Sequence, residues 1–167
     1  MFSETCMNVP IDSRAFRTAL GAFATGVTIV TTRGPQGELV GNTVNSFTAV
    51  SLDPPLVLWS LGKRAYSFKS YLSADHFAVN VLREGQEDIS RRFARSLDDK
   101  WTGIDYETWD NGCPVLPNAL AVFECKMAYT YQGGDHVIFV GEVTNFDHDP
   151  TGKPLIFWHG NYRLVTK

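Results

Sequence analysis

Four short segments of this sequence combine residue types that could bind or orient a ligand. In one of them, Gly133-Gly134-Asp135-His136, a carboxylate stands beside an imidazole in a glycine-rich turn. A neighbouring carboxylate can fix the tautomer and orientation of a histidine ring, and glycines let a ligand approach the backbone closely. The same residues also make a good hairpin turn, in which Asp135 and His136 would simply face water.

The second segment, GNTVNSFTAVS at 41–51, packs small hydrogen-bonding side chains into a stretch that is otherwise strand-like. A planar heterocycle with several carbonyls and ring nitrogens would suit such a lining, because hydroxyl and amide groups both donate and accept. The alternative is an ordinary strand with one wet face. The polar residues are Asn42, Thr43, Asn45, Ser46, Thr48 and Ser51.

The third segment, SLGKRAYS at 60–67, follows an apolar stretch and precedes an expected helix. Helix N-termini bind anions through free N–H groups and the helix dipole, and Lys63 and Arg64 would add positive charge there. Ser67 would add a hydroxyl. This pattern predicts a phosphate site, although a solvated basic turn would look the same.

The fourth segment, FWHGNYR at 157–163, gathers aromatic residues with a histidine and an arginine at the end of a strand. Such residues could stack on a ring and pair with a phosphate. Phe157 and Trp158 could equally close the core at a sheet edge or make a subunit contact.

Several familiar chemistries are absent from the sequence. There is no G-x-G-x-x-G after a strand and no G-x-S-x-G, and Gly62-Lys63 lacks the upstream glycine of a P-loop. The histidines at 76, 136, 148 and 159 and the cysteines at 6, 113 and 125 are too dispersed for a metal site or a disulfide framework. If the protein is an enzyme, a bound cofactor therefore carries the chemistry.

The elements that must position these segments are mostly strands. Apolar spacing predicts helices at 11–25, 65–72 and 85–97, the first capped by Asp12 and stopped by Gly26. A long polar surface loop is expected at 96–118. In the segment 119–131, alternation places Glu124 and Lys126 on a polar face. Strands are expected at 27–32, 38–44 continuing through 47–51, 56–60, 76–82, 119–131, 136–145 and 155–158.

Roughly seven strands joined by tight turns imply antiparallel pairing, and a sheet of this size manages its edges best by closing on itself. We therefore expect a small barrel with peripheral helices, with ordinary α+β packing as the alternative. The chain has 167 residues and a formal charge of −3, which favours one domain over 1–167 and no nucleic-acid partner. No apolar run approaches the ~20 residues of a membrane span and no secretory signal is visible, so a cytoplasmic location is expected.

The whole pattern resembles one family. From about Phe16 to Leu164 the chain carries FATGVTIVTT, GNTVNSFTAVSLDPPLVLWSL, HFAVNVL, GGDH and LIFWHGNYRL in that order. This order resembles the short-chain flavin reductases of two-component monooxygenases, in the flavin reductase-like, FMN-binding split-barrel superfamily. NSFTAVSLDPPLV and GDH are specific in combination. The resemblance implies a mainly β split barrel that is a homodimeric NAD(P)H:flavin oxidoreductase and supplies reduced FMN or FAD to a separate oxygenase.

The resemblance also implies site residues. It places the flavin ring and ribityl chain against Asn42, Thr43, Val44, Asn45, Ser46 and Phe47, and its phosphate near Ser60, Leu61, Lys63, Arg64 and Ser67. It places Asn80, Val81 and Leu82 beside the ring, and has Arg92 and Phe93 reach the cofactor from a helix. It assigns Asp135, His136, His159, Gly160, Asn161 and Tyr162 to NADH or NADPH.

In that arrangement we expect His136 to orient the nicotinamide carboxamide and Asp135 to fix the histidine tautomer. Three alternatives stay open from the sequence: a flavin-binding electron carrier without its own nicotinamide site, a split-barrel oxidase of another substrate such as a pyridoxine phosphate, and a domain without a ligand. The choices between FMN and FAD and between NADH and NADPH also stay open.

Overall fold

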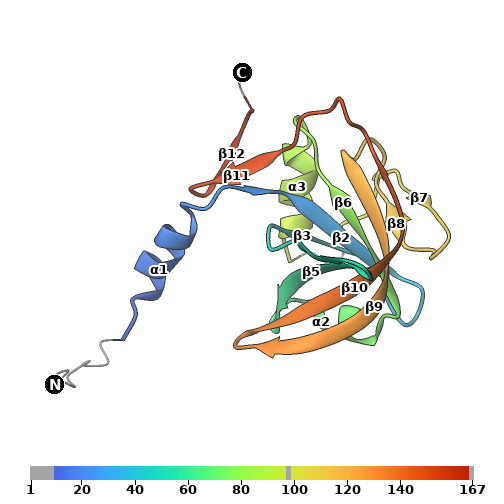
Figure 1. Cartoon of the computed structure of the whole chain (residues 1–167), viewed down its shortest axis with the longest axis horizontal. Coiled ribbons are helices and arrows are strands. Elements are labelled where there is room, and N and C mark those ends of the chain that lie inside the picture. The colour runs from blue at the N-terminus through green and yellow to red at the C-terminus, as the bar shows by residue number, and fades with distance from the viewer. Residues whose placement is uncertain (1–9, 97–98, 166–167) are drawn as a thin grey trace.

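The computed structural model of the chain describes residues 10–96 and 99–165. Its centre is a strongly curved antiparallel sheet of seven strands in the order β3-β2-β6-β9-β10-β5-β4 (Figure 1). These strands are β2 (Thr28–Arg33), β3 (Leu39–Val44), β4 (Thr48–Leu52), β5 (Pro55–Gly62), β6 (His76–Val81), β9 (Ala121–Gly133) and β10 (His136–His148).

The two edge strands of this sheet, β3 and β4, follow each other in the chain and do not pair with each other. The sheet is therefore not closed into a continuous ring. The mainly β class, the antiparallel pairing and the split-barrel prediction are confirmed. The strands form where β-branched residues follow one another, as in β2. Five of the six residues of β2 are buried, so this strand is covered on both faces of the sheet.

The described part of the chain has three short helices, α1 (Ser13–Leu20), α2 (Phe68–Ser73) and α3 (Glu87–Ala94), and α2 and α3 lie beside the sheet (Figure 1). Asp12 caps α1 as predicted, with its carboxylate accepting a hydrogen bond from the Ala15 N–H at 2.6 Å. The prediction that this helix runs to Gly26 was wrong. It ends at Gly21, because the following residues turn to form β1 (Thr25–Gly26), whose two residues pair with β11.

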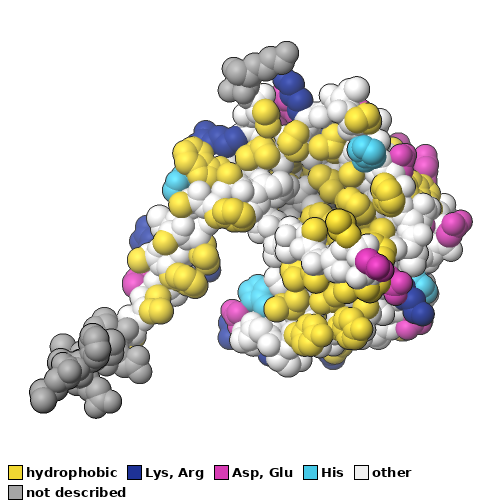
Figure 2. Space-filling model, viewed as in Figure 1, with side chains coloured by type: hydrophobic (Ala, Val, Ile, Leu, Met, Phe, Trp, Pro, Cys, Tyr) yellow, Lys and Arg dark blue, Asp and Glu magenta, His cyan; other side chains and the backbone are white. Residues whose placement is uncertain are grey.

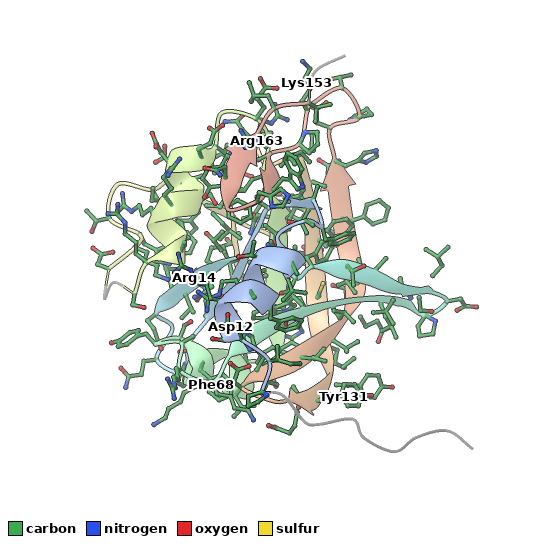
Figure 3. All side chains as sticks on the ribbon, turned by 90° about the vertical axis from the view of Figure 1, so that its left-hand side faces the viewer. Asp12, Arg14, Phe68, Tyr131, Lys153 and Arg163 are labelled. Carbon is green, nitrogen blue, oxygen red and sulfur yellow. The ribbon has the colours of Figure 1, made fainter. Side chains whose placement is uncertain are left out.

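A second, small sheet has the order β1-β11-β12, in which β11 (Ile156–Trp158) and β12 (Asn161–Arg163) form a C-terminal hairpin. Beside this hairpin, α1 projects away from the body of the molecule (Figure 1). From the side of α1, Asp12 and Arg14 lie in front of the body, with Arg163 toward one end of the molecule and Tyr131 toward the other (Figure 3).

The prediction of a surface loop over residues 96–118 was wrong in part. Two short strands, β7 (Glu107–Thr108) and β8 (Pro114–Val115), pair within it. Cys113, Val115 and Leu116 are buried, and the Leu116 N–H donates to Asn80 Oδ1 at 2.8 Å. Short apolar runs between polar residues hide this contribution to the core.

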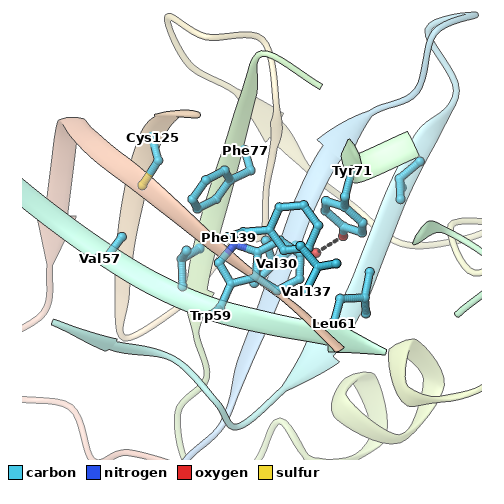
Figure 4. Packing of buried hydrophobic residues seen from close by; sticks show 11 residues of the cluster. Val30, Val57, Trp59, Leu61, Tyr71, Phe77, Cys125, Val137 and Phe139 are labelled. Carbon is cyan, nitrogen blue, oxygen red and sulfur yellow. Dashed lines mark hydrogen bonds between the residues drawn. The ribbon is translucent and has the colours of Figure 1, made fainter. Parts of the chain in front are cut away.

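The main core lies inside the curved sheet and is aromatic (Figure 4). Trp59 stacks on Phe139 with ring centroids 4.7 Å apart and meets Tyr71 edge-on at 4.8 Å. Tyr71 is fully buried, and its hydroxyl donates to the Val30 carbonyl oxygen at 2.6 Å. These rings fix the distance between β5, β10 and α2, which together support the candidate site.

Glu124 of β9 is also fully buried, although alternation placed it on a solvated face. Its carboxylate accepts hydrogen bonds from the Asn111 N–H at 3.0 Å and from Asn145 Nδ2 at 3.4 Å. The pairing of β9 with β10 is irregular around this residue, with a register shift between Val143 and Asn145. Such an irregularity re-aims side chains, and here it accompanies the turning of a carboxylate toward the loop that packs on the sheet.

None of the helices in the described part of the chain combines the length and the apolarity that a membrane crossing needs.

Candidate functional site

The second and third predicted segments, 41–51 and 60–67, meet where β3 ends. The hydroxyl of Ser46 lies beside Ser60 of β5, accepting from its N–H at 2.9 Å and lying 3.2 Å from its carbonyl oxygen. Ser67, just before α2, donates its hydroxyl hydrogen to Asn42 Oδ1 at 2.5 Å. The segments 42–47 and 60–67 are therefore held against each other by side-chain hydrogen bonds.

The GGDH turn joins the same region. The Lys63 N–H donates to the Asp135 carbonyl oxygen at 2.9 Å, and the Lys63 ammonium donates to the Gly134 carbonyl oxygen at 2.7 Å. In the pairing of β10 with β5, His136 stands opposite Gly62, and a Cβ atom on that glycine would lie 3.6 Å from His136 Nε2. The imidazole thus lies over a residue that has no side chain.

Asp135 and His136 form the predicted pair, with 2.7 Å between Asp135 Oδ1 and His136 Nδ1. Both side chains are exposed. The hydrogen bond to His136 lowers the pKa of Asp135 below its ordinary 3.8. The carboxylate stays ionised at neutral pH and favours a proton on Nδ1, which leaves Nε2 of the neutral ring as an acceptor.

The C-terminal segment reaches the site through α3. Thr43 donates its hydroxyl to the Ser90 carbonyl oxygen at 2.7 Å, and the Ser90 and Tyr162 hydroxyls are 2.8 Å apart. The Arg91 guanidinium lies 4.9 Å from the centre of the Tyr162 ring. Hydrogen bonds therefore link the four predicted segments one to the next: GGDH to 60–67, 60–67 to 42–47, and 42–47 through Ser90 to Tyr162.

Two hollows lie on either side of Asn45, the exposed residue of the segment 42–47. One, of about 590 Å³, lies between α1 and the C-terminal hairpin, and the other, of about 170 Å³, lies between α3 and the same hairpin. Asn45 and Phe157 line both. We call the two hollows together the Asn45 groove; its other lining residues include Thr18, Leu20, Phe23, Val44, His159, Gly160 and Tyr162.

Several polar side chains that were predicted to contact a ligand form hydrogen bonds within the protein instead. The side chains of Asn42, Thr43 and Ser46 bond other protein groups, so the segment 42–47 offers a ligand mainly Asn45 and backbone. Lys63 and Arg64 are exposed. Of the C-terminal residues, His159 and Gly160 line the groove, and Asn161 donates to the His159 carbonyl oxygen.

Four predicted contact residues have side chains that are buried or bonded within the protein. Asn80, Leu82 and Phe93 have no exposed surface, so their side chains cannot face a ligand. Asn80 bonds the Ile29 carbonyl and the Leu116 N–H, which uses its amide inside the core. Arg92 donates to the Thr102 carbonyl oxygen rather than standing free.

Sequence reasoning missed the wall that α1 supplies. The Trp158 indole donates to the Ala22 carbonyl oxygen at 3.1 Å, and the His159 N–H donates to the Gly21 carbonyl oxygen at 3.0 Å. These bonds bring the end of α1 to the groove, although about 136 residues separate the two segments in the chain. No pattern within α1 itself indicates this contact.

A family model described as "Flavin reductase like domain" matches residues 20–166. The chain belongs to this family. The family's domain spans the whole curved sheet and the C-terminal hairpin, so every segment that lines the Asn45 groove except part of α1 falls inside it.

Relatives named as flavin reductases or reductase subunits are similar over most of this chain. An FMN reductase (NADH), SmoA of Agrobacterium fabrum, is 49% identical over 154 residues, covering 90% of this chain and 85% of its own. The stachydrine N-demethylase reductase subunit Stc3 of Rhizobium meliloti is 48% identical over 135 residues, or 81% of this chain. This chain spans only 59% of Stc3 and 44% of a probable flavin reductase of the same organism.

A solved structure shares the fold. The NADH:FAD oxidoreductase SgcE6 of Streptomyces globisporus, in complex with NAD and FAD fragments, superposes with a TM-score of 0.89 at 40% identity. The match covers 95% of each chain. The curved sheet, the hairpin and the peripheral helices are therefore a known arrangement for a flavin reductase.

Proposed function

We propose that this protein is an NADH-dependent flavin reductase that transfers a hydride from the nicotinamide to FMN or FAD. The observation that carries the proposal is that hydrogen bonds link the segment 42–47 to the basic stretch 60–67, and that stretch to the turn that carries the Asp135–His136 pair. The names of SmoA and SgcE6 support both the nicotinamide and the flavin.

The residues present fit a flavin. The Asn45 groove has an aromatic wall at Phe157, an exposed amide at Asn45 and small residues along its floor. Lys63 and Arg64, on the far side of the Ser46–Ser60 contact, would neutralise the phosphate charge. When bound, the flavin supplies the hydride acceptor. The protein's own part is to orient the two rings and exclude competing reactions.

His136 and Asp135 are the proposed contacts for the nicotinamide. The bond from Asp135 holds the imidazole over Gly62, and an accepting Nε2 suits the amide hydrogens of a carboxamide. His159 and Gly160, which line the Asn45 groove, are further proposed contacts for the nicotinamide nucleotide. Tyr162, bonded to Ser90, would hold that part of the groove in place.

The test is anaerobic mixing of the protein and NADH with FMN and with FAD, followed by the flavin absorbance. Catalytic bleaching with either flavin is expected, and NADPH serves as the comparison for the nucleotide. Flavin that binds without bleaching would favour the electron carrier instead. Protein that binds neither flavin would favour a domain without this ligand.

A separate flavin-dependent oxygenase is the proposed acceptor of the reduced flavin, since Stc3 is named as the reductase subunit of a demethylase. An open groove supports this role, because a product that leaves must not be enclosed. The test is product formation by an oxygenase supplied only with this reductase, NADH and flavin. Formation that persists when the two proteins are separated by a dialysis membrane would show transfer by diffusion.

A homodimer is proposed from the exposed apolar surface. Every residue of α1 is at least partly exposed, with Phe16 at 54% and Leu20 at 59%, and Phe23 beyond it is 79% exposed. Further exposed apolar residues, Leu52, Tyr129, Tyr131 and Phe146, lie on the body, and Figure 2 shows such side chains on both parts. Patches of this kind mark interaction sites. Light scattering should give a dimer mass, and Leu20→Glu should give a monomer where the exposed Arg14→Glu does not.

One domain over 1–167 and a cytoplasmic location complete the proposal. The three buried clusters share the strands of one sheet, which supports a single folding unit. Cys113 and Cys125 are free thiols, as is usual in a reducing compartment.

A further inference from the structure

A third pocket lies outside the Asn45 groove, at the other end of β3. It has a volume of about 300 Å³, at the lower end of the range for small-molecule sites. We call it the Lys100 pocket. Its lining residues are Glu38, Leu39, Val40, Gly41, Tyr66, Ser67, Ser70, Lys100 and Trp101.

The pocket begins where the proposed flavin phosphate site ends. Ser67 lines it and is bonded to Asn42 of the flavin segment. Four residues of extended chain separate Asn45 from Gly41, or about 14 Å at ~3.4 Å per residue. A ligand that continues past the first phosphate would therefore enter the Lys100 pocket.

The charge in the pocket suits a second phosphate. The Lys100 ammonium donates to the carbonyl oxygens of Gly41 at 3.1 Å and Phe93 at 2.9 Å. An ammonium has three N–H groups, so one is left for a ligand among the residues that the structure describes. The Glu38 carboxylate is turned back to the Gln36 N–H at 3.0 Å, in the turn that precedes β3.

The walls suit a flat base. The Trp101 ring packs edge-on against Phe93 at 4.8 Å, and its indole N–H is buried without an acceptor in the described part of the chain. Tyr66, a second aromatic lining residue, is 75% exposed. A buried donor without a partner is uncommon and calls for an explanation, which an adjacent ligand site would give.

The pocket is also preformed. The Asp99 carboxylate accepts from the backbone N–H groups of Trp101 and Thr102 at 2.8 and 2.9 Å. Arg92 of α3 donates to the Thr102 carbonyl oxygen. These bonds hold the turn 99–102 that carries Lys100, and burial lowers the pKa of its ammonium. A preformed wall loses little conformational entropy when a ligand binds.

From these observations we infer that the Lys100 pocket binds the adenylate half of FAD, so that this protein prefers FAD to FMN. The inference rests on the proposed function, because it extends the same flavin site. The relatives do not decide the matter, since SmoA is named for FMN and SgcE6 for FAD.

The experiment measures the dissociation constants of FAD, FMN and ADP for the whole protein, by flavin fluorescence and by calorimetry. We expect FAD to bind at least about tenfold tighter than FMN, and ADP to compete with FAD. Ser70→Tyr places a large ring in the pocket from α2 and should bring FAD down to the affinity of FMN. Lys69→Tyr, at an exposed position of the same helix, should change neither value.

Several results would overturn the inference: equal affinities for FAD and FMN in the unmodified protein, equal weakening of both flavins by Ser70→Tyr, or ADP that competes with NADH and not with FAD. A melting curve shows whether Ser70→Tyr is folded. If it is not, Lys100→Met and the ADP competition carry the same expectations.

The proposed function fails separately. If NADH reduces FMN while FAD binds no better, only the adenylate site is lost. If neither flavin is reduced, the reductase proposal is lost whatever the affinities are.

Discussion

The aromatic core and the candidate site around Asn45 and His136 share β3, β5 and β10 but use them in opposite ways. In the core, Trp59 and Phe139 have no exposed surface, and their rings stack on each other. At the candidate site, Asn45 and His136 are exposed, and most polar side chains near Asn45 are bonded to other protein groups.

The difference separates two tasks. Dense packing of rings fixes β5 and β10, and small hydroxyl and amide side chains then fix the loops at their ends. A variant in the core should therefore lose stability and function together, whereas a variant of an exposed residue at the candidate site should lose function alone.

The largest expected effect is in the core. Phe139→Ala removes a ring that stacks on Trp59 and contacts Tyr71, so we expect a loss of about 3–5 kcal/mol in the free energy of unfolding. Urea unfolding measures it. A loss comparable to that of the exposed variant Tyr131→Ala would show that the rings do not support the sheet.

A smaller loss is expected at Gly41 of β3, which packs on Phe93 of the second buried cluster. Gly41→Ala would place a methyl group 2.5 Å from the Phe93 ring, so something must shift, and we expect about 1–3 kcal/mol of destabilisation with weaker flavin binding. Gly26→Ala is the matched control, because a Cβ atom there has nothing within 4 Å. Equal melting temperatures for the two variants would contradict this packing.

A variant at His136 should lose function and keep its stability. His136→Ala leaves the core untouched, so we expect an unchanged melting temperature and a rise of about tenfold in the KM for NADH, equivalent to ~1.4 kcal/mol. Flavin affinity should change much less. Equal loss of flavin and NADH affinity, measured by titration and steady-state kinetics, would remove His136 from the nicotinamide site.

The smallest effect concerns the cysteines. Burial raises the pKa of the Cys113 thiol from 9.0 to about 11, and burial also raises that of Cys125. At pH 8 the thiolate fraction of Cys113 should be about 100-fold below that of a free cysteine. A thiol reagent should therefore react with neither residue in native Cys6→Ser protein, where Cys6 itself lies outside the described residues. It should react with both after unfolding, and rapid reaction in the native state would show that the sheet opens.

Raised thiol pKa values also set a sign for alkaline pH. The folded state keeps the Cys113 proton up to a higher pH than the unfolded chain, so this contribution to stability is full below about pH 9. It falls as the pH rises toward about 11. Urea unfolding at pH 8 and pH 10.5, compared with Cys113→Ala, measures the difference.

The sequence allowed the strands to be predicted because β-branched runs and glycine turns are local signals. It also allowed the flavin and GDH segments to be identified, since the family's motifs are contiguous. It could not show that Asn80 and Phe93 turn into the core, because burial depends on which neighbours the sheet brings. The sequence places Lys100 and Trp101 in a loop, since what makes them a pocket wall is their contact with Gly41, far away in the chain.

The hydroxyl of Ser46 has a consequence for the shape of the opening between β3 and β4. It bonds the backbone of Ser60 just beyond the last β5 residue that β4 pairs with, so one side chain continues the ladder where the strand has stopped. The two free margins of the sheet are thereby pinned at the corner that holds Asn45. The opening between β3 and β4 would therefore widen only at the end away from Asn45, while the segment 42–47 stays in place.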